Sequence, residues 1–318
     1  MQKFGVVLLA MAACACSTSV DIDLNTPQKP VLNLLASAGS PVTLSLSTTW
    51  HYDKPDEKRY PTDYEAVLTV NGQFVETMSG LDSDDPDCGH QIKSDYIVRE
   101  GDKIEVSVVT ADYGTLKAAT EVPEKVSIES TDFTYTVYED HNSMWSDGVN
   151  IYYSTTVRFN YRITFTDPAG EENYYMLSGN VYPSDPIFDE NQNAIDGIID
   201  NDNYSYFSIF SDRSIDGKTY ALNCFTLHYN HPYYGSHDGS IDRIGLYSIS
   251  RDYYHYLLSV LKKDSGLQGT LDEIGLGEPQ TVFTNIEGGL GIAASQSGET
   301  VEVDVSEFIE EALGKQAM

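Results

Sequence analysis

The sequence has few basic residues for its size. Its 318 residues include 19 Lys and Arg against 49 Asp and Glu, a formal net charge of -30 at pH 7. Nucleic-acid phosphates are bound by clustered Lys and Arg side chains, so this balance argues against a nucleic-acid-binding protein. It also disfavours direct attraction to anionic lipid headgroups. A solvated acidic surface is the simplest interpretation, and calcium is the metal ion that such carboxylates suit.

Long apolar runs are also missing, apart from one short run at the beginning. Lys3 precedes an apolar or small-residue segment, Phe4 to Ala13, which leads into Cys14-Ala15-Cys16. A bilayer span takes about 20 apolar residues, so this run has the length of a signal peptide instead. Small residues leading into a cysteine resemble the lipobox of bacterial lipoproteins. The resemblance implies cleavage before the cysteine and acylation of its thiol and amine.

Two cysteines are alternative lipidation sites. Cys16 is preferred over Cys14, because it leaves the longer apolar run and brings Asp21 and Asp23 nearer the new N-terminus. Several acyl chains anchor a protein durably, whereas one chain binds membranes only marginally. No later segment approaches a membrane span, so the lipid is the expected membrane contact.

Cysteine is scarce elsewhere in the chain. Cys88 lies in a polar loop sequence, and Cys224 lies in an apolar strand-like run. An oxidising compartment would permit a disulfide between them. The two cysteines fall in different predicted domains, however, so a buried thiol and a separate loop thiol are the alternative.

The first predicted domain, residues 29–123, is an Ig-like β-sandwich. Tyrosine is frequent and Val, Ile and Thr alternate with polar residues, which is typical of β-structure. The clearest hairpin joins 66–70 to 73–77 through Asn71-Gly72, a pair that accepts the positive φ values of a type I′ turn. Further strands are expected at 31–37, 42–47, 104–110 and 116–122. Turn residues between these short strands favour the sandwich.

Residues 124–318 are predicted to form a larger antiparallel β-domain with one main helix. Strands are expected at 126–138, 150–166, 172–182, 204–210, 219–229, 241–249, 281–283 and 300–305. The segment 172–182 is expected to return from the turn that ends 150–166. Ser250 is expected to cap the main helix over 251–263, and a short acidic helix follows at 306–313. The signal peptide and lipidated cysteine occupy 1–16, and a tether occupies 17–28.

Three stretches in the second domain resemble a known family. They are Phe210 to Tyr220, Ser248 to Leu257 and Glu278 to Ile292. In this order, behind a lipoprotein signal, they resemble the DUF4249 family of Bacteroidota lipoproteins. The resemblance implies an outer-membrane lipoprotein, often encoded beside TonB-dependent transporters, and brings no established activity. Physically, the glycines at 288, 289 and 291 favour a bulged strand or a close approach of two backbones.

One segment has the spacing of a calcium loop. Asp189, Asn191, Asn193 and Asp200 fall on the first, third, fifth and twelfth positions of such a loop. Ala194 replaces the glycine of the sharp turn, Asp200 is shorter than the usual glutamate, and no flanking helices are expected. A solvated loop is therefore the alternative to a calcium site.

A loop rich in histidine and tyrosine supplies the candidate ligand contacts. They are His228, Tyr229, His231, Tyr233, Tyr234 and His237. A spacing of three along a strand puts His228 and His231 on opposite faces, which disfavours a zinc site. Tyrosine stacks on ligand rings and forms hydrogen bonds through its hydroxyl, so a contact surface is the better reading. An exposed hairpin tip without a ligand is the alternative.

No catalytic motif is present in the sequence. The run Gly289 to Ala294 matches a dinucleotide fingerprint, but a strand pattern follows it where a helix is required. The nucleophile elbow, the Walker loop and the His-Glu-x-x-His motif are all missing. We therefore expect a non-enzymatic outer-membrane lipoprotein, facing the periplasm or the cell surface, that binds a ligand or partner as an accessory to a TonB-dependent transporter. A structural or adhesive surface module, or a hydrolase acting on glycan or peptide, is the alternative.

Overall fold

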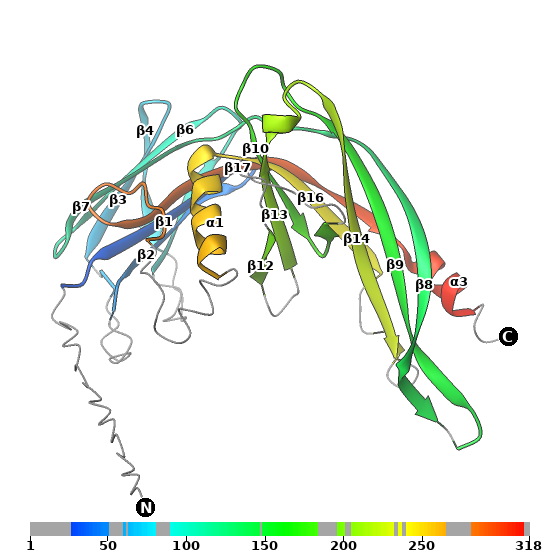
Figure 1. Ribbon diagram of the computed structural model, residues 1–318. Coiled ribbons are helices and arrows are strands. Elements are labelled where there is room, and N and C mark those ends of the chain that lie inside the picture. The colour runs from blue at the N-terminus through cyan, green and yellow to red at the C-terminus, as the bar shows by residue number, and fades with distance from the viewer. Residues whose placement is uncertain are drawn as a thin grey trace, which may run out of the picture.

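The strands of this protein form two sheets that meet in an arch (Figure 1). The computed structural model describes residues 27–50, 60–61, 63–80, 90–146, 148–183, 196–200, 205–231, 235–236, 240–264 and 281–314. These residues form mainly strands, together with the helices α1 (Arg251–Asp264) and α3 (Ser306–Gly314) and the 3-10 helix η2 (Asp212–Ser214). The mainly β class predicted from the sequence is confirmed.

The larger sheet contains strands from both ends of the chain. Its order is β12 (Asp196–Asp200), β13 (Ser205–Ser211), β10 (Tyr174–Gly179), β16 (Ile241–Ile249), β17 (Leu290–Asp304), β1 (Pro30–Ser37), β2 (Pro41–Thr48), β5 (His90–Ile97), β4 (Gln73–Gly80), β3 (Tyr64–Val70), β6 (Lys103–Thr110) and β7 (Gly114–Glu121). The smaller sheet has the order β11 (Tyr182–Pro183), β14 (Thr219–His231), β9 (Ile151–Thr166) and β8 (Ile128–Ser146), and β15 (Gly235–Ser236) pairs with β14.

The strands β1 to β7 enclose the first hydrophobic core. Every second residue of a strand points to the same side, and residues such as Leu32, Leu68 and Ile104 are completely buried there. The predicted hairpin between β3 and β4 is present. Its turn residues Asn71 and Gly72 have φ values of 53° and 76°, as a type I′ turn requires.

Strand β17 joins the two halves of the molecule. Its first part, up to Gln296, pairs with β1 in parallel, and its second part, from Gln296 onward, pairs with β16 in antiparallel fashion. Ala293 of β17 and Ile286 just before it belong to the first core, although both lie near the end of the chain. The domain division at residue 123 stays a prediction, and it divides a sheet that is continuous through β17.

The prediction for this part of the chain was wrong in detail. The residues 281–283 are not a strand, and β17 begins at Leu290, whereas the alternation predicted a strand only from residue 300. Glycine and serine in 288–298 have low strand propensity, and pairing on both sides overrides it. The close backbone approach expected of the glycines is confirmed: a Cβ at Gly291 would lie 2.1 Å from the carbonyl oxygen of Leu32.

The second hydrophobic core lies between the two sheets. Phe159, Tyr161 and Phe165 of β9 pack there against the β10 and β16 strands, and α3 covers its edge with Ile309. The segment 172–182 was expected to return against β9, but β10 pairs with β13 and β16 in the other sheet. The four residues Tyr174 to Leu177 are all buried, so β10 is covered on both faces, as a central strand is.

The main helix α1 covers the opposite face of the larger sheet. Its buried residues Tyr254, Leu257 and Leu258 pack on Ile209 and Ile249. The helix begins at the predicted position, and the Tyr253 amide donates to the Ser250 hydroxyl over 3.4 Å. None of the helices in the described ranges is long and apolar enough to cross a membrane.

Candidate functional site

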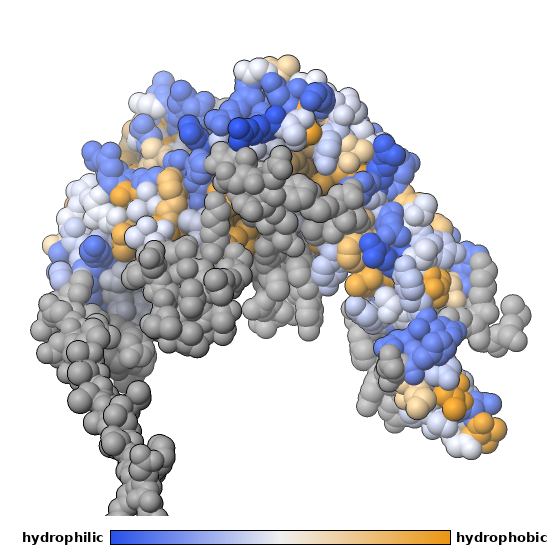
Figure 2. All heavy atoms as spheres, in the orientation of Figure 1, coloured by the Kyte–Doolittle hydropathy of each residue, from blue (hydrophilic) through white to orange (hydrophobic). Residues whose placement is uncertain are grey.

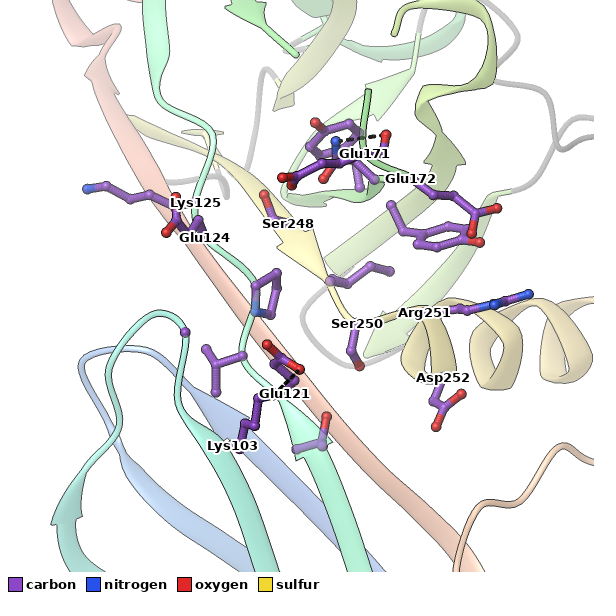
Figure 3. A pocket seen from close by; sticks show the side chains of 18 of the residues that line it. Lys103, Glu121, Glu124, Lys125, Glu171, Glu172, Ser248, Ser250, Arg251 and Asp252 are labelled. Atoms are coloured by element: carbon purple, nitrogen blue, oxygen red, sulfur yellow. Dashed lines mark hydrogen bonds and ion pairs between the residues drawn. The ribbon is translucent and has the colours of Figure 1, made fainter. Parts of the chain in front are cut away.

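Three adjoining hollows surround the beginning of α1. The largest of the three has a volume of about 930 Å³ (Figure 3). Its walls come from β6 and β7, the connecting segment 122–126, the loop before β10 and the first turn of α1. A second hollow of about 670 Å³ lies between α1 and residues 281–283. A third of about 550 Å³ lies beside η2. Glu172 and Tyr174 line the first and third hollows, and Arg251 lines the first and second.

The first turn of α1 supplies charge of both signs to these hollows. Ser250 directly follows β16 and caps the helix, so the chain turns here from the sheet to the surface. Arg251 is exposed and its Nε lies 3.5 Å from Nε2 of His255, one turn later. Asp252 accepts a hydrogen bond of 2.7 Å from the side-chain amide of Asn285. A carboxylate is favourable in the first turn because the helix dipole is positive there.

Aromatic rings line the same region. The rings of Tyr174 and Tyr254 are 4.6 Å apart, and the ring of His255 lies 6.1 Å from Tyr174 and 6.0 Å from Phe283. Burial raises the pKa of Tyr174, and the hydrogen bond and charge of Glu172 raise it further. Its hydroxyl therefore remains a neutral donor at physiological pH. Rings and neutral hydroxyls of this kind are common in ligand-binding surfaces.

Asn285 holds the segment 281–286 against α1. Its side-chain oxygen accepts from the Ala293 amide over 2.7 Å, and its side-chain nitrogen donates to the Ala293 carbonyl over 3.0 Å. The Phe283 amide donates to the Ser259 hydroxyl over 3.0 Å. These bonds fix the position of the Phe283 ring. The three sequence stretches that carry the family resemblance therefore meet here, through η2, the first turns of α1 and this segment.

A cluster of three carboxylates lies next to the third hollow. Ligand oxygens of Asp167, Asp212 and Asp216 all lie within 4.8 Å of one another, the one such group among the residues that the structure describes. Burial raises the pKa of Asp212, and the charges of Asp167, Asp216 and Glu172 add to this. Oxygen ligands of this type suit a hard cation.

The hydrogen bonds of this cluster show its structural role. Asp167 accepts from Tyr175 and from the Gly217 amide, and Asp212 accepts from the Asn173 amide over 2.8 Å. The cluster thus ties the loop between β9 and β10 to the turn after η2. Sequence reasoning missed it, because Asp167 lies 45 positions from Asp212 and no spacing rule connects them.

The predicted contact residue His228 lies in the protein interior. It is 3% exposed, and its Nε2 lies 2.9 Å from the completely buried carboxylate of Asp242. Thr226 donates to the same carboxylate over 2.7 Å, and the Tyr161 hydroxyl donates as well. The prediction of a loop contact is therefore wrong for His228, because β14 extends to residue 231 and this position faces the core.

The other predicted contacts are not brought together in the described part of the chain. Tyr229 is 54% exposed and lies on the opposite face of β14 from His228. His231 ends β14 and so lies in a strand, not a loop. Tyr233, Tyr234 and His237 lie outside the described residues.

The predicted metal and lipid sites also fall largely outside the described residues. Asp189, Asn191, Asn193, Cys14, Cys16 and Cys88 all lie outside them. Asp200 is the last residue of β12 and pairs with Ser205, so the end of the predicted calcium loop is strand. Cys224 is buried and free, and burial raises the pKa of its thiol to about 12.

Comparison with known proteins places the chain by family. None of the curated proteins matches it significantly. Among solved structures, the apo structure of Bacteroides uniformis beta-glucuronidase 3 shares 12% identity over 69% of this chain and 23% of that chain, with a TM-score of 0.20. The chain thus spans about a quarter of that structure's length, and a likeness this low says nothing about activity.

A family model, by contrast, matches nearly the whole chain. The family described as "Domain of unknown function (DUF4249)" matches residues 17–301. That range contains the strands β1 to β16, most of β17, the helix α1 and the residues lining all three hollows. The chain therefore belongs to the DUF4249 family.

Proposed function

We propose that this protein is a lipid-anchored binding protein of the outer membrane that captures a ligand or partner and assists a TonB-dependent transporter. The observation that carries the binding role is the group of three hollows around the first turn of α1. Their volumes fall in the range of about 300–1,000 Å³ that is usual for sites of small ligands. The anchor and the transporter partnership rest on the lipobox-like residues before Cys16 and on the family resemblance.

The side chains of these hollows suit a polar ligand. Arg251 offers a guanidinium group at the positive end of a helix, which favours an anionic group of the ligand. Glu172 lines the same hollow and favours a donor group. Phe283 and His255 offer rings for an apolar or ring-shaped part. The hydrogen bonds of Asn285 and Ser250 hold these groups in place before a ligand arrives.

We further propose that residues 29–123 are an Ig-like β-sandwich that serves as the scaffold for this site. The shared burial of Leu32 in β1 and Leu68 in β3 supports two facing layers. Rigid sandwiches commonly present functional groups at their edges and loops. In this proposal the edge formed by β6 and β7 supplies one wall of the largest hollow.

The transporter partnership is tested by purification from the native membrane. The protein carries an affinity tag at its C-terminus, and co-eluting proteins are identified by mass spectrometry. A β-barrel transporter in a stoichiometric amount is the expected result. A matched variant with Cys14→Ser and Cys16→Ser should be depleted from the membrane fraction and should no longer co-elute with the transporter. Elution of the wild-type protein alone, with the membrane fraction intact, would contradict the partnership and leave the anchor in place.

A screen of nutrient compounds first identifies a ligand that raises the melting temperature of the full chain. The affinity for this ligand then tests the binding site. The double variant Arg251→Ala, Phe283→Ala should bind that ligand with an affinity at least about tenfold lower, which corresponds to ~1.4 kcal/mol of binding free energy. Phe74→Ala is the matched control, since Phe74 is 67% exposed on β4 and lines none of the three hollows. Equal affinity of the double variant and the control would place the site elsewhere.

A further inference from the structure

The hairpin of β8 and β9 projects beyond the rest of the molecule. Thr155 of β9 pairs with Glu139 of β8 on one side and with Asn230 of β14 on the other. Beyond this point, within the part of the chain that the structure describes, the two strands pair only with each other, from Asp140 and Ser154 towards the turn. Figure 1 shows the resulting arm at one foot of the arch. An isolated two-stranded hairpin is only marginally stable in water, so binding to another surface would stabilise the arm.

Large apolar side chains are concentrated on this arm. Four of the 13 large apolar side chains that are exposed in the described residues belong to it: Met144, Val149, Ile151 and Tyr152. Val137 and Tyr138 are also exposed and lie on β8 just before the arm begins. Val149 is 88% exposed and Met144 is 62% exposed. Figure 2 shows the apolar colouring gathered at the end of the arm. Soluble proteins rarely concentrate apolar surface in this way unless it is bound by something.

The end of the arm is apolar on both faces. Trp145 lies opposite Tyr152 with the two rings 5.3 Å apart, and Met144 lies opposite Tyr153. Residues that are directly opposite share a face, and neighbours along a strand point to opposite faces. The Trp145 pair therefore occupies one face and the Met144 pair the other, and Val149 lies in the turn between them. Docking on a flat protein surface needs one apolar face, whereas insertion into a surrounding apolar medium needs both.

We propose that this end of the arm, residues 144–146 and 148–153, inserts into the lipid–water interface of the membrane to which the chain is anchored. The inference rests on the proposed lipid anchor at Cys16. The ten residues 17–26 between that cysteine and the described chain reach at most about 33–36 Å when fully extended. Such a tether holds the body close to the bilayer. In Figure 1 the beginning of β1 and the end of the arm lie at the two feet of the arch, so both reach the same side of the molecule.

The composition of the arm favours apolar over electrostatic contact with lipid, because Glu139, Asp140 and Asp147 in or next to it are acidic and would be repelled by anionic headgroups. Tryptophan and tyrosine are enriched at lipid–water interfaces, where the ring is buried and the polar group stays hydrated. The stretch 139–157 contains no Lys or Arg. Attraction to anionic headgroups therefore contributes nothing, and the binding should be driven by apolar burial. It should persist on zwitterionic vesicles and in 1 M salt.

The first test follows the environment of Trp145. The full chain carries Cys14→Ser and Cys16→Ser, which removes acylation, and Trp50→Phe, which leaves Trp145 as the one tryptophan. On phosphatidylcholine–phosphatidylethanolamine vesicles, we expect its emission to shift to the blue and brominated acyl chains to quench it. The matched variant Trp145→Phe keeps Trp50, which should not be quenched. No shift and no quenching of Trp145 would overturn the proposal.

The second test measures vesicle partitioning. In the same non-acylated chain, Met144→Ser, Val149→Ser and Ile151→Ser together should weaken partitioning by at least about tenfold, since three apolar side chains leave the interface. The control triple variant changes exposed apolar residues of the other half, with Phe74→Ser, Ile97→Ser and Val109→Ser. Unchanged melting temperatures show that both variants are folded. Equal losses in the two variants would overturn a specific role of the arm.

The third test separates lipid from a protein partner. A photo-crosslinking residue at position 149 should form adducts with lipid in the native membrane. Adducts with a membrane protein alone would overturn the proposal in favour of a protein socket. Incorporation of labelled palmitate into the wild-type chain tests the anchor separately. A chain that takes no palmitate disproves the anchor at Cys16, while the vesicle experiments still decide whether the arm binds lipid.

Discussion

At the scale of single residues, the most constrained group is the carboxylate of Asp242. It is completely buried between the two sheets, and Tyr161, Thr226 and His228 direct hydrogen-bonding groups at it. A buried charge is tolerated only when its surroundings replace the water it has lost. Burial and this carboxylate raise the pKa of the Tyr161 hydroxyl, which therefore stays protonated and continues to donate. The network specifies how β9, β14 and β16 sit relative to one another.

Replacing this carboxylate should therefore be costly. We expect Asp242→Ala to lower the free energy of unfolding by about 3–5 kcal/mol, because several buried donors lose their acceptor at once. Urea unfolding followed by circular dichroism measures the change. Asp132→Ala on the exposed part of β8 is the matched control and should stay within about 0.5 kcal/mol of wild type.

The conservative variant Asp242→Asn provides a second measurement in case the Asp242→Ala protein does not fold. Asp242→Asn retains one acceptor oxygen and the side-chain volume, so its loss should fall between those of Asp242→Ala and the control. An Asp242→Ala protein as stable as the Asp132→Ala protein would show that the network contributes no stability.

At the scale of elements, the sequence predicted strand positions better than strand partners. The alternation of apolar and polar residues in the sequence predicted the bounds of β1, β2, β14 and β16 to within one or two residues. It could not assign β10 to the other sheet, because pairing depends on what covers the two faces of a strand and local alternation does not record this. It also missed the first part of β17, where glycine and serine conceal a strand that packing stabilises.

Gly291 is the residue on which the pairing of β1 with β17 depends. Its φ is 112°, and a Cβ would lie 2.1 Å from the carbonyl oxygen of Leu32. Gly291→Ala should therefore cost about 3–5 kcal/mol, as the sum of backbone strain and steric overlap. Gly39→Ala is the matched control: its φ is also positive, at 82°, but nothing lies within 4 Å of the added Cβ.

The control should lose about 1–2 kcal/mol from backbone strain alone. Thermal unfolding of both variants by calorimetry separates the two contributions. A loss at Gly291 no larger than the loss at Gly39 would mean that β1 and β17 separate easily enough to admit a side chain.

At the scale of the whole molecule, the sequence could not have revealed the candidate site. The hollows are formed by β6 and β7, the loop before β10, the residues around η2, the beginning of α1 and residues 281–283, which come from five separate parts of the chain. The stretches typical of the family were visible, but no pattern within them says that they converge. The same sequence separation hides the link between the two cores. Leu32 and Leu246 belong to different cores, and β17 pairs with the strands of both.

This link predicts that a substitution that destabilises one core also destabilises the other. Cys224 is a natural reporter of the second core, because it is 0% exposed and reacts with a thiol reagent only when that core opens. In a chain with Cys14→Ser, Cys16→Ser and Cys88→Ser, we expect Leu32→Ala in the first core to accelerate labelling of Cys224. The substitution costs about 2–5 kcal/mol, and each 1.4 kcal/mol corresponds to a tenfold faster labelling when opening is global.

Leu246→Ala provides the comparison, because it lies in the same core as Cys224 and must accelerate labelling whether or not the cores are coupled. If the cores opened independently, Leu32→Ala would lower the melting temperature of the first core and leave the labelling rate of Cys224 at its wild-type value. Acceleration by both substitutions would mean instead that β17 makes the two halves one cooperative unit. A ligand held between β7 and α1 would then stabilise the entire molecule, since its hollow is formed by residues from both halves.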